Sequence, residues 1–314
     1  MKKLLIASIL FLTFCVSVRA QIIPDTIFDD QSQAFGNTIQ DVAPDILDVK
    51  IVNARSGELG SQVKAKVWVD PEKSKFKVKE VFAYYSTGQS NTVMDRISFN
   101  PIEGEEYWWS ADISAPGEKI EVFLGATDEL GNAVQQLPEI DSLNPEKSIK
   151  IIHDGLDSGI DKILDIDNVS FGFSGEYMVS CIEMGNAFQS YSEKGANALV
   201  IGFVPEDLRF DPSRSCVDNN AGFVGYLPAL GISGVFNLNN VEQGTKPEGE
   251  AVIKMSGNKV CMKNKISTLT STPERGLKVF AATGAINAVS DEVIFVDATP
   301  YAILYFGGYK QAAD

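Results

Sequence analysis

Alternation of apolar and polar side chains with a period of two residues limits the folds open to this chain more than any other feature. It is clearest over residues 63–69, where Val63, Ala65, Val67 and Val69 are separated by Lys64, Lys66 and Trp68. Successive side chains of a strand point to opposite faces, so this pattern is typical of a half-buried antiparallel strand. Similar segments recur along the chain, and no amphipathic helix stands out. The sequence therefore predicts an all-β fold.

The length and the spacing of these segments suggest two units. The chain has 314 residues, of which 44% are hydrophobic, enough for one or two cores. About seven short strands over residues 45–140 predict a sandwich. Roughly nine more over 166–314 predict a larger sandwich of jelly-roll type. We expect a flexible leader at 21–44 and a linker at 141–165, where Pro145 and several aspartates interrupt the apolar pattern.

Several motifs in the first unit resemble the Ig-like modules of bacterial extracellular proteins. They are 81–85 (VFAYY), 105–113 (EEYWWSADI), Pro116-Gly117 and 123–132 (FLGATDELGN). The resemblance implies a seven-stranded sandwich that serves as a spacer, scaffold or adhesive unit. Its most specific element is the turn over 126–132, where Gly131 and Asn132 tolerate positive φ. The second unit is similar, in strand layout alone, to secreted bacterial β-sandwich modules that bind carbohydrate or other small ligands.

The first twenty residues read as a secretory signal peptide. Lys2 and Lys3 precede an apolar stretch that is short for a membrane span, and small residues follow before Gln21. Lipid attachment at Cys15 is the alternative, but Phe14 stands where a lipobox has a small residue. We therefore expect a protein of the periplasm or cell exterior, with no membrane span after signal removal.

Charge excludes one class of partner. The chain has 27 basic and 42 acidic residues, a net charge of -15; without Lys2, Lys3 and Arg19 the balance is 24 minus 42, or -18. So acidic a chain is unsuited to binding nucleic acid over a broad surface.

Three cysteines remain after the predicted signal: Cys181, Cys216 and Cys261. An oxidising compartment favours a disulfide, and three cysteines allow at most one within the chain. We predict Cys216–Cys261, because both residues follow polar turns, and interpret Cys181 as a small buried apolar side chain. The other two pairings stay open.

A row of lysines is the first candidate ligand site. It comprises Lys64, Lys66, Lys73, Lys75, Lys77 and Lys79. Alternation directs most of them to one sheet face together with Trp68, which suits an anionic polysaccharide, a lipid headgroup or an acidic partner protein. The alternative is a solvated face whose lysines protect a sheet edge. Of the neighbours Trp108 and Trp109, one must face the core; we include Trp109 among the ligand-binding candidates.

A run of acidic residues is the second candidate. Asp154, Asp157, Asp161, Asp165 and Asp167 lie close together in the predicted linker. Carboxylates and backbone carbonyls are ligands of calcium, so calcium is the one cofactor that this pattern suggests. The spacing does not match an EF-hand loop, and solvated linker charge is the alternative. A weaker cluster contains Asp207, Asp211, Asp218, Asn219 and Asn220.

Catalytic motifs do not stand out. His153 is the only histidine, which excludes multi-histidine metal sites, and no Gly-x-Ser-x-Gly or phosphate-binding loop occurs. The 42 acidic residues leave a glycosidase with two carboxylates possible, but no pair is singled out. We therefore expect a secreted, non-catalytic binding or surface-associated protein that binds a polysaccharide or another surface protein. A structural subunit of an extracellular assembly and a carboxylate-dependent glycoside hydrolase are the alternatives.

Overall fold

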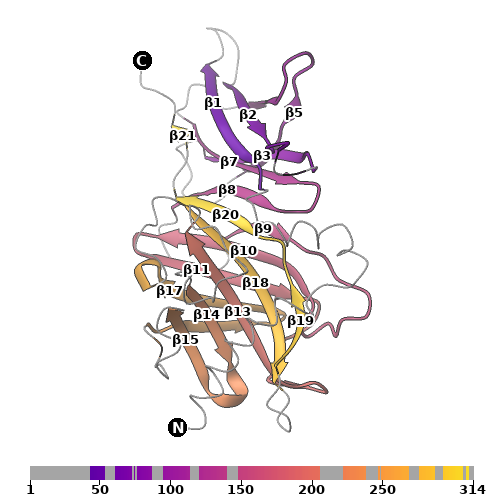
Figure 1. The fold of residues 1–314 in the computed structure, drawn as a ribbon. Helices are drawn as coiled ribbons and strands as arrows, with labels where there is room; N and C mark the ends of the chain where they lie inside the picture. The colour runs from indigo at the N-terminus through magenta and orange to yellow at the C-terminus, as the bar shows by residue number, and fades with distance from the viewer. Residues whose placement is uncertain are drawn as a thin grey trace.

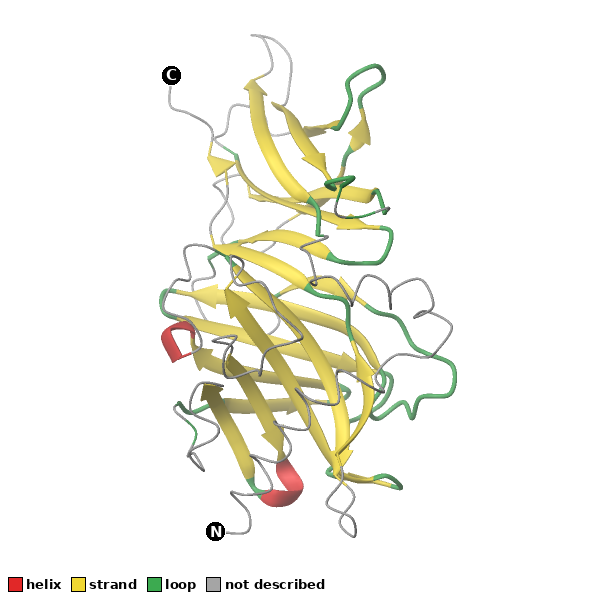
Figure 2. Ribbon diagram, in the orientation of Figure 1, coloured by secondary structure: helices red, strands yellow, loops and turns green. Residues whose placement is uncertain are grey.

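The computed structural model confirms the all-β prediction (Figures 1 and 2). It describes residues 43–53, 61–72, 74, 76–86, 95–113, 120–139, 148–205, 222–237, 247, 249–268, 276–286, 293–306 and 309–310. The predicted signal peptide and all but the last two residues of the predicted leader lie outside these ranges. The only helical elements among the described residues are the 3-10 turns η3 (Pro228–Leu230) and η5 (Ile266–Thr268).

The strands are β1 (Asp45–Asn53), β2 (Ser61–Trp68), β3 (Val78–Ser86), β4 (Asp95–Ser98), β5 (Asn100–Pro101), β6 (Trp108–Ile113), β7 (Glu121–Asp128), β8 (Ala133–Leu137), β9 (Ile149–His153), β10 (Ile166–Ser174), β11 (Tyr177–Met184), β12 (Tyr191–Ser192), β13 (Gly195–Pro205), β14 (Gly222–Leu227), β15 (Ile232–Asn237), β16 (Val252–Ser256), β17 (Lys259–Lys265), β18 (Leu277–Ile286), β19 (Val293–Ala298), β20 (Ala302–Phe306) and β21 (Tyr309–Lys310).

These strands form three sheets. A four-stranded sheet has the order β1-β2-β6-β5, and a five-stranded sheet has the order β16-β17-β11-β10-β9. The third sheet has twelve strands, with the main path β15-β14-β13-β18-β20-β8-β7-β3-β4. Each smaller sheet packs on part of the long one, so the molecule contains two sandwiches (Figure 1).

The smaller core follows directly from the alternation in β2. Val63, Ala65 and Val67 are buried there, while the polar residues between them are partly exposed. They pack with residues of β3 and β7 in the long sheet, among them Val81 and Leu124. The predicted strand at 63–69 is thus confirmed, and its apolar face is the one that meets the long sheet.

The larger core lies between the five-stranded sheet and the β13–β18 region of the long sheet. Phe171, Ile182 and Met262 come from the first sheet, and Phe203 and Val279 from the second. The strands here are buried on most positions, as in β10 and β13, so their sequence shows less alternation than β2 does.

Strands β8 and β20 belong to both sandwiches. They pair in parallel, with Val134 opposite Ile303 and Leu137 opposite Phe306. Val134 and Ile303 pack in the smaller core, whereas Leu137 and Leu304 pack in the larger one. Because successive side chains leave a strand on opposite faces, the two smaller sheets cover opposite faces of one long sheet.

The turn between β7 and β8 is built around a buried carboxylate. One oxygen of Asp128 accepts hydrogen bonds from the backbone N–H groups of Leu130 and Asn132, both at 2.9 Å, and the other accepts from Asn132 Nδ2 at 3.0 Å. Gly131 has a φ of 91°, which favours glycine. Burial raises the pKa of Asp128, and these hydrogen bonds oppose the increase. The sequence marked this turn correctly, with Gly131 rather than Asn132 at positive φ.

The segment predicted as a linker contains a strand. Residues 148–165 are described, and Ile149–His153 form β9, whose Ile149, Ile151 and Ile152 join the larger core. His153 is exposed at the end of this strand, where its Nδ1 lies 2.9 Å from Asn168 Oδ1. The chain also returns to the first unit at its end, since β20 pairs with β8 and β21 pairs with β7.

The predicted disulfide is wrong. Cys261 bonds to Cys181, with the two Cα atoms 4.0 Å apart, and therefore cannot bond to Cys216. The two cysteines lie directly opposite each other on β17 and β11, on the outer face of the five-stranded sheet. That register depends on the pairing of distant strands, which residue spacing does not reveal. Cys216 lies outside the described residues.

Removal of this disulfide should destabilise the fold. The bond joins residues 80 positions apart, so its loss should lower the free energy of unfolding by about 2–4 kcal/mol. Urea unfolding of the wild type and of the Cys181→Ala/Cys261→Ala double variant measures this difference. Peptide mapping without reductant should yield a peptide pair containing residues 181 and 261. Recovery of a pair that joins 216 to 261 would contradict the structure.

Candidate functional site

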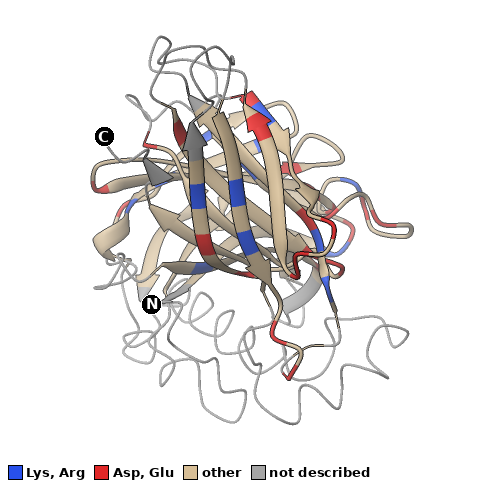
Figure 3. Ribbon diagram, turned by 90° about the horizontal axis from the view of Figure 1, so that it is seen from above, with Lys and Arg blue, Asp and Glu red and all other residues tan. Residues whose placement is uncertain are grey.

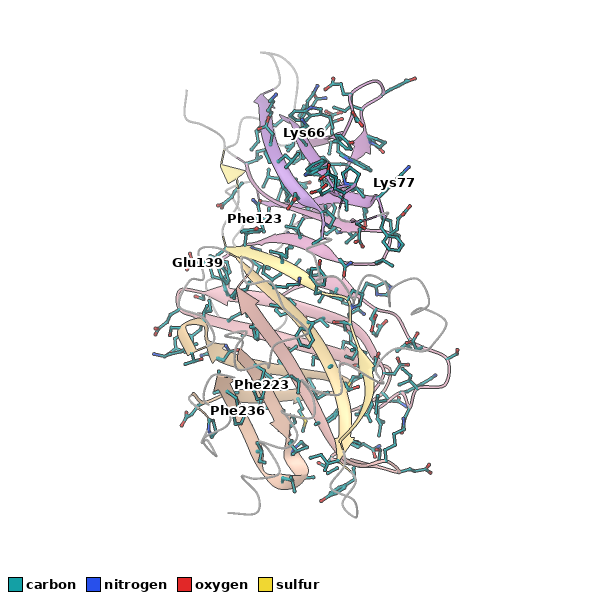
Figure 4. All side chains as sticks on the ribbon, in the orientation of Figure 1. Lys66, Lys77, Phe123, Glu139, Phe223 and Phe236 are labelled. Carbon is teal, nitrogen blue, oxygen red and sulfur yellow. A yellow bond between two sulfur atoms is a disulfide. The ribbon has the colours of Figure 1, made fainter. Side chains whose placement is uncertain are left out.

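The predicted row of lysines does not form one surface. Lys64 and Lys66 lie on β2 in the four-stranded sheet, whereas Lys77 precedes β3 in the long sheet. The two positions are well separated on the smaller sandwich (Figure 4). Lys77 is fixed by paired hydrogen bonds with Glu129, through its backbone N–H and carbonyl. Lys79 is exposed on β3. Lys73 and Lys75 lie outside the described residues.

Three of the predicted ligand-binding residues, Lys64, Lys66 and Trp68, lie together on the outer side of the four-stranded sheet. We call it the indole face; it comprises Lys50, Lys64, Lys66, Trp68 and Trp108. Lys50 Nζ lies 4.5 Å from the centre of the Trp108 ring, and the Trp68 ring meets Tyr107 edge-on with centroids 5.9 Å apart. Trp68 Nε1 is buried and has no hydrogen-bond partner.

Trp109 does not belong to the indole face. It pairs with Ala65, whose side chain is buried, and it packs against the smaller core. Trp108 pairs with Lys66 and occupies the outward position instead. The sequence predicted that the rings of Trp108 and Trp109 point to opposite faces of the strand. Which of them faces the core depends on which strand pairs with β6.

Acidic groups offset the lysines of the indole face. Lys50 lies 3.6 Å from Asp48, and Lys64 lies 3.8 Å from Glu105. Asp112 is on the same face, where it accepts a hydrogen bond from Gln62. Figure 3 looks down on this end of the molecule and shows basic and acidic residues side by side on neighbouring strands. The face is therefore mixed in charge.

A more basic surface lies on the outer side of the five-stranded sheet. We call it the basic face; its lysines are Lys150, Lys254, Lys259, Lys263 and Lys265. They come from β9, β16 and β17, and the register of the strands aligns them around the Cys181–Cys261 disulfide. The described acidic residues paired with them are Glu176 and Glu183, at 3.1 Å from Lys265 and 3.2 Å from Lys150.

An aromatic ring lies within the basic face. Tyr177 on β11 is directly opposite Lys265 and partly exposed. The Nζ atoms of Lys263 and Lys265 lie 4.9 and 5.4 Å from the centre of its ring. A hydrogen bond with Glu176 raises the pKa of Lys265, so this lysine is firmly cationic. Lys150 and Lys254 join the lysines of β17 only through strand pairing, which residue spacing does not reveal.

Three of the five predicted metal ligands come together in the loop between β9 and β10. Asp154, Asp157 and Asp165 interact electrostatically with one another, and Asp297 of β19 joins them. We call these four residues the acidic cluster. Burial, reinforced by repulsion from Asp297, Asp157 and Asp165, raises the pKa of Asp154 to about 8. Burial likewise raises the pKa of Asp297 to about 6, against the effect of its backbone hydrogen bonds.

Of the other two predicted ligands, Asp167 also raises the pKa of Asp165 through charge repulsion and so lies near the cluster. Asp161 is exposed and its carboxylate accepts a hydrogen bond from the backbone N–H of Ile163 at 3.3 Å. Asp167 accepts one from Asn168 Nδ2 at 2.6 Å. Asp297 was missed because it is more than 130 positions from the loop, and only the pairing of β18 with β19 brings it there. The weaker cluster at 207–220 lies outside the described residues.

The acidic cluster is poorly placed to act on a substrate. Asp165 and Asp297 are 0% and 7% exposed, so their carboxylates are not open to a bulky sugar. Within the described residues no three His, Cys, Asp or Glu side chains are grouped closely enough to hold a metal ion as they stand. What the cluster does provide is a set of partly buried carboxyl groups that repel one another when ionised.

No protein-family model matches the chain, and no curated protein matches it. The relation to Ig-like modules stays a prediction. In the part of the chain that the structure describes, no helix has the length and apolar character needed to cross a membrane.

The raised pKa values predict a pH dependence of stability in the metal-free protein. Asp154 and Asp297 bind protons more tightly when folded, so the contribution of protonation to stability is fully present below about pH 4. It is lost as the pH rises through about 6 for Asp297 and about 8 for Asp154. Melting in a chelator should therefore give a lower midpoint at about pH 9 than at about pH 5. The Asp154→Asn variant should flatten this profile, and an unchanged profile would contradict the assignment.

Proposed function

We propose that this chain is a secreted, non-catalytic binding protein whose larger sandwich binds an acidic polysaccharide on the basic face. In this proposal the smaller sandwich is a spacer that carries the larger one. The observation that supports it best is the placement of Tyr177 beside Lys263 and Lys265, within five lysines on one sheet face.

The charge pattern favours an anionic polymer. Five lysines face two glutamates on the basic face, a local excess of three positive charges in a chain of net charge -15. A single exposed ion pair contributes little, but a polymer presents carboxylates at regular intervals and engages several lysines at once. The negative charge elsewhere opposes contact with an anion over the rest of the surface.

The chemistry of the face suits a sugar acid in particular. The partly exposed ring of Tyr177 offers an apolar surface with a polar tip, against which a pyranose ring can stack. Lys263 and Lys265 lie close enough to that ring to reach a carboxylate on the same sugar. Lys254 makes no ion pair with any described acidic residue, so its charge is available to a neighbouring sugar, whereas Lys259 lies opposite Glu183.

Affinity electrophoresis through gels containing polygalacturonate or neutral dextran tests this function. Polygalacturonate should retard the protein and dextran should not, and the retardation should weaken with added salt. The Lys263→Gln/Lys265→Gln variant should bind about ten-fold more weakly, because two charges nearest the ring are lost. The Lys64→Gln/Lys66→Gln variant removes the same charge from the indole face and should bind like the wild type.

The control variant also identifies the way in which the proposal would fail. Loss of binding in Lys64→Gln/Lys66→Gln, with binding kept in Lys263→Gln/Lys265→Gln, would place the ligand on the indole face instead. Equal retardation by dextran would show that charge is not what the protein recognises.

One observation favours the alternative of a structural subunit. Strand β16 is an edge of the five-stranded sheet, and Val252 and Met255 on it are 60% and 54% exposed. An exposed apolar edge strand is a surface on which another strand can pair. Sedimentation of the purified protein without ligand separates the two functions: a monomer supports the binding protein, and a concentration-dependent assembly supports the subunit.

A further inference from the structure

The acidic cluster joins two parts of the chain that are far apart in sequence. Asp297 Oδ2 accepts a hydrogen bond from the backbone N–H of Ile166 at 2.7 Å, and its Oδ1 accepts from its neighbour Ala298 at 2.8 Å. Thr283, opposite Asp297 on β18, donates its hydroxyl to the carbonyl of Leu164. The end of the β9–β10 loop is thereby fixed against β18 and β19.

One oxygen in the cluster has no partner. Asp165 is 0% exposed; its Oδ1 accepts a hydrogen bond from the backbone N–H of Asp157 at 3.0 Å, while its Oδ2 is buried without any. A buried carboxylate oxygen without a donor is costly to the fold. Such an atom, beside several other carboxylates, indicates a cationic group that completes the site.

The described side chains do not supply that cation. Lys162 is the one lysine whose charge acts on Asp165, and it is exposed. The hydrogen bonds that reach Asp165 and Asp297 come from backbone N–H groups, which carry no full charge. The negative charge of the cluster is thus incompletely compensated by the part of the chain that the structure describes.

We propose that Asp154, Asp165 and Asp297 bind a calcium ion that ties the β9–β10 loop to β19. All three ligands are carboxylates, which favours a hard cation over zinc. Calcium accepts irregular sets of six to eight oxygens, including water and backbone carbonyls, whereas magnesium demands a near-ideal octahedron. The site is separate from the basic face and does not depend on the polysaccharide proposal.

Binding requires one carboxylate to move. Asp165 and Asp297 are held in place by the backbone N–H groups of Asp157, Ile166 and Ala298. Asp154 is partly exposed and its carboxylate accepts no hydrogen bond from the described residues, so no described donor fixes its orientation. In this proposal Asp165 and Asp297 are already in place and Asp154 closes on the ion when it binds. This accounts for the absence, among the described residues, of three side chains grouped closely enough to hold a metal ion.

Isothermal titration of the chelator-treated full-length protein with calcium chloride tests this site. One calcium should bind per chain, and the melting midpoint should rise with calcium, since an ion bound only to the folded state stabilises it. Asp297→Asn and Asp154→Asn should each weaken calcium binding by about ten-fold or more. Asp161→Asn, in the same loop but outside the cluster, is the matched control and should bind like the wild type.

The two ligand variants protect the test against misfolding. Asp297→Asn loses one of two backbone hydrogen bonds and can destabilise β19, but Asp154 accepts none from the described residues. Asp154→Asn should therefore keep the wild-type circular dichroism spectrum while losing affinity. Absence of any saturable calcium binding would overturn the proposal. So would calcium binding that Asp161→Asn weakens and Asp154→Asn does not.

Discussion

The parallel pairing of β8 with β20 is the contact on which the rest of the arrangement depends. It joins a strand at the end of the first unit to one near the end of the described chain, and it makes a single sheet from what would otherwise be two. Val134 and Ile303 contribute to one core, and Leu137 and Leu304 to the other. Burying each such side chain stabilises the fold by about 2 kcal/mol, so loss of this pairing would weaken both sandwiches together.

This arrangement also determines which surfaces stay open. The long sheet is covered on opposite faces by the two smaller sheets, so the outer sides of those smaller sheets are left to carry the indole face and the basic face. The acidic cluster lies elsewhere, where the β9–β10 loop reaches β19. The basic face and the acidic cluster thus occupy different parts of one acidic chain.

The alternation of apolar and polar residues was enough to predict strands but not how the strands pair. It predicted β2 and its buried face, because Val63, Ala65 and Val67 are separated by polar residues. The Asp128–Asn132 turn was also predictable, since its hydrogen bonds are local. Features that depend on strand register could not be predicted from the sequence. They are the partner of Cys181, the orientation of Trp109, the alignment of Lys150 with Lys254, and the position of Asp297 beside Asp165.

Native-state hydrogen exchange tests most directly whether the shared sheet makes the two sandwiches one cooperative unit. If it does, the slowest amides of β2, β8, β11 and β20 should exchange with the same free energy, equal to that of global unfolding, and calorimetry should show one transition. A lower opening free energy confined to β1, β2 and β6, with β11 and β13 still protected and a separate calorimetric transition, would show that the smaller sandwich unfolds alone and would contradict this account.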